Sequence, residues 1–282
     1  PRSVRRPRVA PTGADLSTDT QQASGRATED MNRQSLPIRD HLLELRRRMT
    51  WAAGSVFVTT VIAFIFHEQI LILLMGPAEG FVDIPNGKPI YTDLTEFLGI
   101  AAKASLLVGL FASLPFVLYQ FVMFVAPGLN PKERKYLYAM LPISLIVFVI
   151  GAAFGYRILF PPMVTFLLTF GSDVATPYIR IGNYVNLMLS LLFWMGVIFE
   201  TPVVIFFLAK IGVVTPRFLA RQRRWAVVAA FILGAIITPT FDPINQTFVA
   251  APIIILYELG IWLAKLAYRG RAAPDMNLDT ES

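Results

Sequence analysis

The chain has 282 residues, of which 55% are hydrophobic and 16% are charged, and its mean hydropathy is +0.58. Soluble domains contain roughly 25% charged residues, so this composition excludes an ordinary soluble protein and indicates one that lies in a membrane. The formal net charge is +6 and there is no cysteine, which excludes a disulfide framework and a thiolate metal site.

Long apolar segments predict an all-α integral membrane protein with six transmembrane helices. A helix needs about 20 mostly apolar residues to cross the hydrocarbon core. Five segments come close to that length or exceed it: 49–66, 97–126, 137–160, 185–209 and 247–264. The remaining segment, 225–237, stops before Pro239 and reaches only about 20 Å, which makes it a short span.

Polar segments at both ends divide the chain into three parts. Residues 1–35 are rich in Ser, Thr, Ala and Arg without periodicity and predict a disordered tail, in which Met31 is an alternative start. Residues 36–268 form the membrane domain, and residues 269–282 form a polar C-terminal tail. In the third span, GAAFG (151–155) matches the spacing of small residues that lets membrane helices pack closely.

Basic residues alternate between the two sides of the predicted spans. They precede the first span, separate the second from the third and the fourth from the fifth, and follow the sixth. They are Arg33, Arg39, Arg46, Arg47, Arg48, Lys132, Arg134, Lys135, Lys210, Arg217, Arg221, Arg223, Arg224, Lys265, Arg269 and Arg271. The positive-inside rule then places both termini in the cytoplasm, so the pI of 9.7 does not indicate nucleic-acid binding.

The residues for catalysis or metal binding are sparse. The two histidines, His41 and His67, fall at opposite ends of the first span, which excludes a zinc-protease motif and disfavours any multi-histidine metal site. The sequence also lacks a phosphate-binding glycine-rich loop. We therefore predict neither an enzyme nor a cofactor.

Carboxylates at the predicted cytoplasmic ends of the spans are the first candidate site. In HLLELRRRM (41–49), Glu44 and Arg48 are four residues apart, so the segment is equally well explained as an interfacial helix with a local ion pair. In FVAPGLNPKERK (124–135), Asn130, Pro131 and Glu133 take the first positions of a helix in the pattern of a capping box. Each carboxylate thus has a structural explanation beside a functional one.

Glu200 is the exception among the acidic residues, because it lies near the bilayer midplane. It is 14 residues from Asn186 and 10 from Lys210, and Pro202 interrupts the helix beside it. A carboxylate at this depth costs a few kcal/mol, so we expect it to face the protein interior. The structural alternative is a stabilising partner on a neighbouring span, such as Gln120 or a serine.

Two further acidic residues lie near the ends of spans. Glu258 precedes Lys265 by two turns, close to the inner surface, and is a secondary candidate for ligand contact. Asp242 lies in the outer turn, where aspartate is a common turn residue.

Together these motifs resemble the TatC family, the signal-receptor subunit of the twin-arginine protein translocase. HLLELRRRM resembles the family's N-terminal cytoplasmic motif, FVAPGLNPKERK its first inner loop, and FETP (199–202) its fourth-span motif. The resemblance covers about residues 36–268. The outer turn, TPTFDPINQ (238–246), is one residue longer than the family's TPPD-type turn.

The resemblance implies a concave, glove-like bundle of six helices with both termini in the cytoplasm, in the bacterial inner membrane. It implies that the protein binds the twin-arginine signal peptides of folded cargo proteins. The residues that it assigns to signal binding are Glu44, Glu133, Phe124 and Arg46.

The family's partners are also implied. They are single-span TatA/TatB-type subunits and membrane lipid, in a complex that contains several copies of this chain. The intramembrane contacts assigned by the resemblance are Glu200, Pro202 and Gln246, with Asp242 in the outer turn.

The main alternative function is that of a secondary transporter of a small solute, with Glu200 as a proton-coupled site. The sequence contains neither the internal repeat nor the second midplane carboxylate that such a transporter would be expected to have. A membrane enzyme is a third class, and it lacks a nucleophile–base pair.

Overall fold

The computed structural model describes residues 41–77, 90–174, 179–238 and 242–269. These residues form helices and turns with no strand, and the only sheet-like contact among them is a parallel bridge between Ile90 and Arg180. The all-α class predicted from the sequence is therefore confirmed. The predicted tail 1–35 with Met31 lies outside the described residues, as do residues 270–282.

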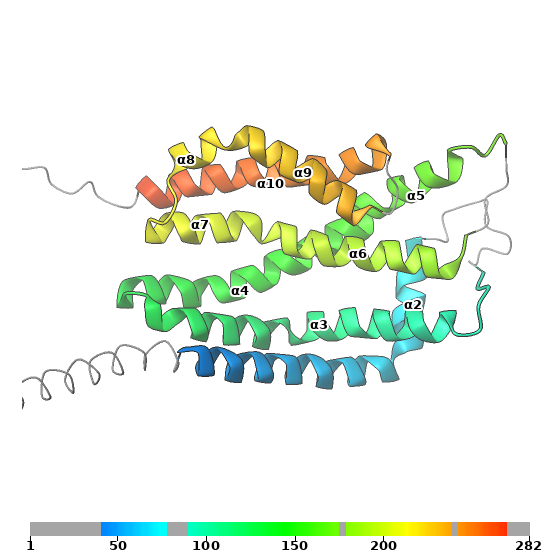
Figure 1. The fold of residues 1–282 in the computed structure, drawn as a ribbon, viewed down its shortest axis with the longest axis horizontal. Coiled ribbons are helices and arrows are strands. Elements are labelled where there is room, and N and C mark those ends of the chain that lie inside the picture. Colours follow the sequence, from blue (N-terminus) through cyan, green and yellow to red (C-terminus); the bar gives the residue numbers. More distant parts are fainter. Residues whose placement is uncertain (1–40, 78–89, 175–178, 239–241, 270–282) are drawn as a thin grey trace, which may run out of the picture. The chain divides into compact units, whose positions relative to one another are not determined.

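The chain divides into two compact units, Pro1–Thr50 and Trp51–Ser282, here called unit 1 and unit 2. The described part of unit 1 is the beginning of a helix, His41–Ile65, that continues into unit 2. Unit 2 then contains nine labelled helices among its described residues (Figure 1): α2 (His67–Met75), α3 (Glu96–Val125), α4 (Pro131–Phe154), α5 (Phe160–Thr169), α6 (Ile181–Phe199), α7 (Thr201–Ile211), α8 (Pro216–Arg221), α9 (Arg223–Ile237) and α10 (Pro243–Arg269).

Two short helical segments that differ from the α-helix follow α3 and α4. A 3₁₀ turn, Ala126–Gly128, follows α3, and a π-helical segment, Gly155–Leu159, joins α4 to α5. Because of that join, the short apolar segment 163–169 belongs to a helix that is continuous with the third span. The other short apolar segment, 70–75, lies in α2.

Five helices are long and apolar enough to cross a membrane, and they make the chain an integral membrane protein. They are His41–Ile65, Glu96–Val125, Glu133–Thr169, Ile181–Ile211 and Pro243–Tyr268. The short predicted span, 225–237, corresponds to α9, which has 15 residues and is therefore about 22 Å long. It is shorter than the other five, as its 13 apolar residues led us to expect.

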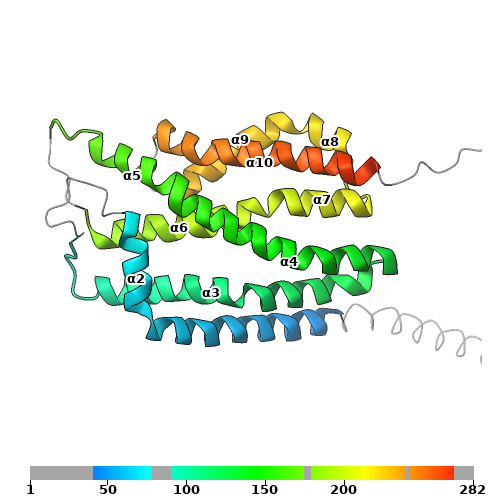
Figure 2. The same cartoon turned by 180° about the vertical axis from the view of Figure 1, so that it is seen from behind.

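The two ends of unit 2 carry different segments. Figures 1 and 2 show the α3–α4 turn, the α7–α8 turn and the C-terminal end of α10 at one end, with α2, α5 and the N-terminal ends of α3 and α6 at the other. We call the first the basic end, because of its residues Arg134, Lys135, Lys210, Arg217, Arg221, Arg223, Arg224, Lys265 and Arg269.

Helix α6 forms the centre of the apolar core of unit 2. Five of its eleven buried residues recur every three or four positions and form one stripe along the helix: Tyr184, Met188, Leu191, Met195 and Ile198. The stripe packs against α3 and α4. Large apolar side chains also cover outward faces of the helices, as lipid-facing surfaces require; examples are Phe57, Phe121, Ile146, Ile232 and Ile255.

Glycine lets α4 approach α6 closely. A Cβ atom added at Gly151 would lie 2.6 Å from the backbone oxygen of Met195 and 2.7 Å from Cβ of Phe199. Glycine at this position therefore permits a helix separation that a larger residue would prevent. The predicted packing role of GAAFG is confirmed.

Hydrogen bonds and an ion pair of Glu96 connect α3 to the start of α6, at the end of unit 2 opposite the basic end. Glu96 Oε2 accepts hydrogen bonds from Arg180 Nη2 at 3.1 Å and from the Thr92 amide at 3.0 Å, and its Oε1 accepts from the Gly182 amide at 3.0 Å. The sequence analysis did not single out Glu96, because its partners lie more than 80 residues away along the chain apart from Thr92.

Candidate functional site

Glu133 lies in the first turn of α4, directly after the short turn that follows α3. Asn130 has an extended backbone, and Pro131 occupies the first helical position, where a missing N–H costs no helical hydrogen bond. The Asn130 amide donates to Glu133 Oε2 at 3.1 Å, and the predicted capping box is confirmed. One carboxylate oxygen is thereby fixed, and the side chain is half-buried.

A small apolar core beneath this turn holds both helix ends in place. Leu137, one turn after Glu133, is buried with Val122 of α3 and with Ala126 of the 3₁₀ turn. Phe124, the half-buried aromatic residue of the predicted site, lies in the last turn of α3, between these two buried positions in the sequence. The packing therefore fixes the backbone that carries both Phe124 and Glu133.

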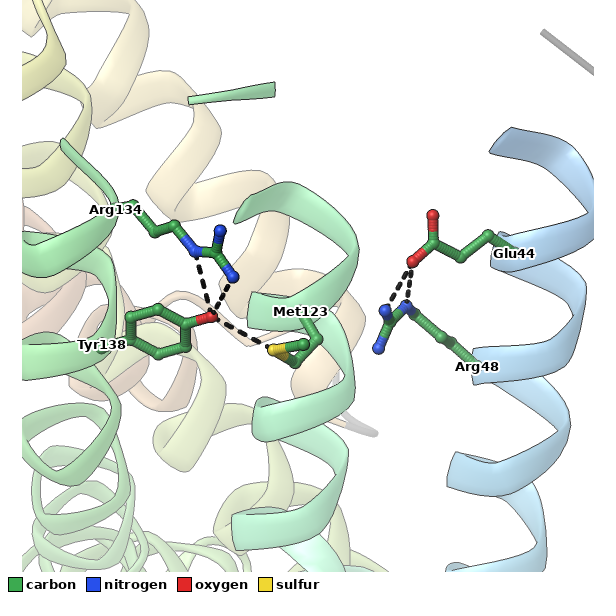
Figure 3. A network of polar contacts seen from close by, with 5 residues as sticks. All are labelled: Glu44, Arg48, Met123, Arg134 and Tyr138. Atoms are coloured by element: carbon green, nitrogen blue, oxygen red, sulfur yellow. Dashed lines mark hydrogen bonds and ion pairs between the residues drawn. The ribbon is translucent and has the colours of Figure 1, made fainter. Parts of the chain in front are cut away.

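The neighbouring cation, Arg134, is held by a tyrosine (Figure 3). Its Nε and Nη2 atoms donate to the hydroxyl of Tyr138 at 3.2 and 3.1 Å, and that hydroxyl donates to Sδ of Met123 in α3 at 3.2 Å. Among the described residues, no ion pair includes Glu133. No cation among the described side chains therefore neutralises the Glu133 carboxylate. Sequence analysis missed this network, although Arg134 and Tyr138 are four residues apart on one helix face.

Glu44 belongs to unit 1, where its contacts lie within the helix. Arg48 Nε donates to Glu44 Oε1 at 2.9 Å, and Arg48 Nη2 contacts the same oxygen (Figure 3). The predicted four-residue ion pair is confirmed, and the Glu44 side chain keeps 35% of its surface exposed. Arg46 is exposed on the same helix, and its backbone oxygen accepts from the Thr50 hydroxyl at 2.8 Å.

The fourth span is interrupted where Glu200 and Pro202 were expected to interrupt it. Helix α6 ends at Phe199 and α7 begins at Thr201, with Pro202 buried in its first turn. Ser144 of α4 donates from Oγ to Glu200 Oε2 at 2.6 Å. Glu200 Oε1 is buried without a partner in the described part of the chain. The serine partner foreseen as the structural alternative is therefore present, and one oxygen remains unsatisfied.

Asp242 directly precedes α10 and binds Asn245 in the first turn of that helix. Its Oδ1 accepts from the Asn245 amide at 2.7 Å, and its Oδ2 accepts from Asn245 Nδ2 at 3.1 Å. Asn245 is fully buried, and its Oδ1 has no partner within the described ranges. Sequence analysis did not identify Asn245. The rest of the predicted outer turn, 239–241, lies outside the described residues.

Gln246 connects α10 to the short helix α9. Its Nε2 donates to the backbone oxygen of Phe231 at 2.6 Å, and its backbone oxygen would lie 2.9 Å from a Cβ added at Gly234. In this structure the amide therefore serves an internal contact between the two helices.

Glu258 also makes an internal contact, at the basic end. Arg223 of α9 pairs with it through two parallel interactions, Nε with Oε1 at 2.7 Å and Nη2 with Oε2 at 2.9 Å. Both carboxylate oxygens are occupied by this bidentate pair, which weakens the case for Glu258 as a ligand contact. No group of His, Cys, Asp or Glu side chains that could hold a metal ion occurs in the described part of the chain.

The sequence matches the family model of the Sec-independent protein translocase protein (TatC) over residues 40–252. The TatC protein of Carboxydothermus hydrogenoformans is 35% identical over 226 residues, covering 80% of this chain and 91% of the relative. That of Aquifex aeolicus is 37% identical over 236 residues, covering 83% and 97%. A crystal structure of the twin-arginine translocase receptor TatC has a TM-score of 0.73 and 37% identity, covering 80% of this chain and 99% of that one. The chain therefore belongs to the TatC family of Sec-independent protein translocase proteins.

Proposed function

We propose that this protein is the receptor component of the twin-arginine translocation system. It binds the signal peptides of folded cargo proteins at the cytoplasmic face and works with single-span TatA/TatB-type subunits to move the cargo across the membrane. Family membership supports a role in protein translocation, and one similar crystal structure carries the name of a twin-arginine translocase receptor.

The observation that carries this proposal is the carboxylate of Glu133. It lies at the basic end on a rigid turn, is half-buried, and is paired with no cation among the described side chains. A guanidinium group offers a planar fork of donors that matches a carboxylate, and such charge-assisted pairs are about twice as strong as neutral hydrogen bonds. Phe124, on the adjoining helix end, provides an aromatic surface on which a guanidinium group stacks.

Glu44 is the proposed second acceptor for the arginine pair, with Arg46 beside it. Its present partner, Arg48, is four residues away on the same helix, both side chains are partly exposed, and ion pairs at this spacing contribute only about 0.3–0.5 kcal/mol. A signal arginine with a better geometry therefore displaces Arg48 at little cost. The displaced Arg48 remains near the site and contributes to the orientation of the peptide.

The proposed topology has six spans with both termini in the cytoplasm, in a concave, glove-like bundle of the bacterial inner membrane. The concentration of cations at the basic end supports this orientation through the positive-inside rule. Helix α9 begins at that end, at Arg223, and α10 returns to it, which supports a crossing by α9 despite its length. Local thinning of the bilayer offsets the mismatch.

Within the membrane, we assign partner contacts to the region of Glu200, Pro202 and Gln246, with Asp242 at the outer edge. The unsatisfied Oε1 atom of Glu200 supports this assignment, because a buried acceptor without a donor gains free energy when a partner supplies one. The partner subunits assemble with several copies of this chain.

Substitution of Glu133 by glutamine separates its two roles. Glutamine keeps the side-chain oxygen that caps α4, so the variant should accumulate normally. Because glutamine lacks the charge, crosslinking of a photoreactive twin-arginine signal peptide should fall by about tenfold or more. Glu133→Asp keeps the charge with a shorter reach and should retain part of the binding.

The matched control is Glu68→Gln, which removes one carboxylate from the first turn of α2, at the opposite end of unit 2. It should leave crosslinking unchanged at equal protein level. Undiminished crosslinking and export by Glu133→Gln would show that Glu133 serves only as a helix cap.

A further inference from the structure

A groove opens at the basic end between α8 and the last turns of α10. Its volume is about 1160 Å³. One wall comes from Thr215 to Ala220 and the other from one face of α10. This groove is separate from the α3–α4 turn proposed to bind signal peptides, since none of its residues belongs to α3 or α4.

The charged side chains that line the groove are both cations. Arg217 lines it from α8, and Lys265 lines it from α10. No acidic residue lines it, whereas the nearby Glu258 is fully engaged by Arg223 outside the lining. Lys265 Nζ lies 5.7 Å from the ring centroid of Trp262, so the aromatic ring restrains this cation at the rim of the groove.

The apolar part of the groove is an exposed stripe along α10. Leu259, Trp262, Leu263 and Leu266 follow a spacing of three and four residues, which places them on one helix face. Trp262 is 69% exposed and Leu266 is 64% exposed. The opposite face of α10 makes the core contacts, through Ile261, Ala264 and Ala267, which are buried with α7 and α8. The stripe is therefore free to contact another molecule.

We propose that this groove binds one anionic glycerophospholipid of the cytoplasmic leaflet. Arg217 and Lys265 contact its phosphate, Trp262 and Tyr268 lie at the level of the ester groups, and the leucines contact the upper part of an acyl chain. Basic pockets between spans at the cytoplasmic surface, flanked by aromatic residues, have the charge and polarity of an acidic headgroup region.

The dimensions of the stripe favour a lipid over a partner helix. Residues 259–266 extend about 10 Å along α10, whereas a spanning helix would need an apolar contact closer to 30 Å long. The two cations lie beside this stripe at the basic end, which matches a molecule with one anionic head and an apolar tail. The inference relies on the proposed topology only for the choice of leaflet, and it is independent of signal-peptide binding.

Native mass spectrometry of the full chain, purified in detergent and titrated with phosphatidylglycerol or phosphatidylcholine, tests the site. The first bound phosphatidylglycerol should bind at least about tenfold more tightly than phosphatidylcholine. The double variant Arg217→Gln/Lys265→Gln should weaken it roughly 25-fold, since each cation near an anionic lipid contributes about fivefold. Arg221→Gln/Arg224→Gln removes the same charge at the same end outside the groove and should change binding less than twofold.

Four results would overturn the proposal. The first is that the wild type and Arg217→Gln/Lys265→Gln bind phosphatidylglycerol equally tightly at matched melting temperature. The second is that Arg221→Gln/Arg224→Gln weakens phosphatidylglycerol binding as much as Arg217→Gln/Lys265→Gln does. The third is competition: millimolar glycerol 3-phosphate should leave the lipid bound, and displacement would indicate a site for free phosphate. Displacement by a single-span partner peptide at equimolar ratio would likewise assign the groove to a protein. Trp262→Ala, which keeps both cations, should weaken binding of both lipids, because it removes the contact with the ester groups that phosphatidylglycerol and phosphatidylcholine share.

Discussion

Gly151→Leu should destabilise the folded protein by about 3 kcal/mol or more, the cost of severe overpacking in a helix interface. The position faces the backbone of α6 at a distance that leaves no room for a side chain, because an added Cβ would lie 2.6 Å from Met195 O. A flexible side chain could move aside, but a backbone oxygen within a helix moves only when the helices separate. Separation would expose the buried stripe of α6, including Met195.

The control for this experiment is Gly99→Ala in α3, where an added Cβ meets no atom within 4 Å. Alanine there should stabilise the helix by about 0.5–1 kcal/mol, since glycine loses more backbone entropy than alanine on folding. Thermal unfolding of both variants in the same detergent measures the difference. Similar melting temperatures for Gly151→Leu and the wild type would contradict the close packing of α4 on α6.

Glu200→Lys should remove most export and block assembly with single-span subunits. A lysine at the centre of a membrane helix costs about 3 kcal/mol, and here it would replace an acceptor that binds the hydroxyl of Ser144. Glu200→Gln is the matched control, since it keeps a side-chain oxygen that accepts from Ser144 and introduces no cation. It should insert and fold as the wild type does.

Ser144→Ala provides an independent check on the same contact. It removes the donor and should cost about 1–2 kcal/mol, because the carboxylate oxygen is then left without its hydrogen bond. Stability and co-purification of partner subunits would be measured for all three variants at equal expression. Normal assembly and export by Glu200→Lys would show that the residue does not lie at an interface inside the membrane.

Local sequence patterns predicted the features of this fold that depend on local chemistry. Apolar runs marked the five long spans, since the bilayer demands a minimum length of apolar helix. Asn130 and Glu133 predicted the start of α4, and Pro202 predicted the interruption after Phe199, because caps and proline breaks act over a few residues.

Contacts between distant segments could not be predicted in the same way. Glu96 pairs with Arg180, 84 residues away, and Glu258 pairs with Arg223, 35 residues away, and no local spacing reveals either pair. The partner of Glu200 was expected to be a polar side chain on a neighbouring span, but only the packing of α4 on α6 and α7 identifies Ser144. The site residues remain predictions, because helix geometry fixes where a carboxylate lies and not what binds it.

The central claim is that this chain recognises a pair of arginines. The most direct measurement compares a twin-arginine signal peptide with its twin-lysine counterpart, each bound to the full chain in membranes that contain its partner subunits. Both peptides carry the same charge, so only the planar, bidentate geometry of the guanidinium group distinguishes them. We predict that the twin-lysine peptide binds about tenfold more weakly and that Glu133→Gln removes this difference. Equal binding of the two peptides to the wild-type chain would contradict the account.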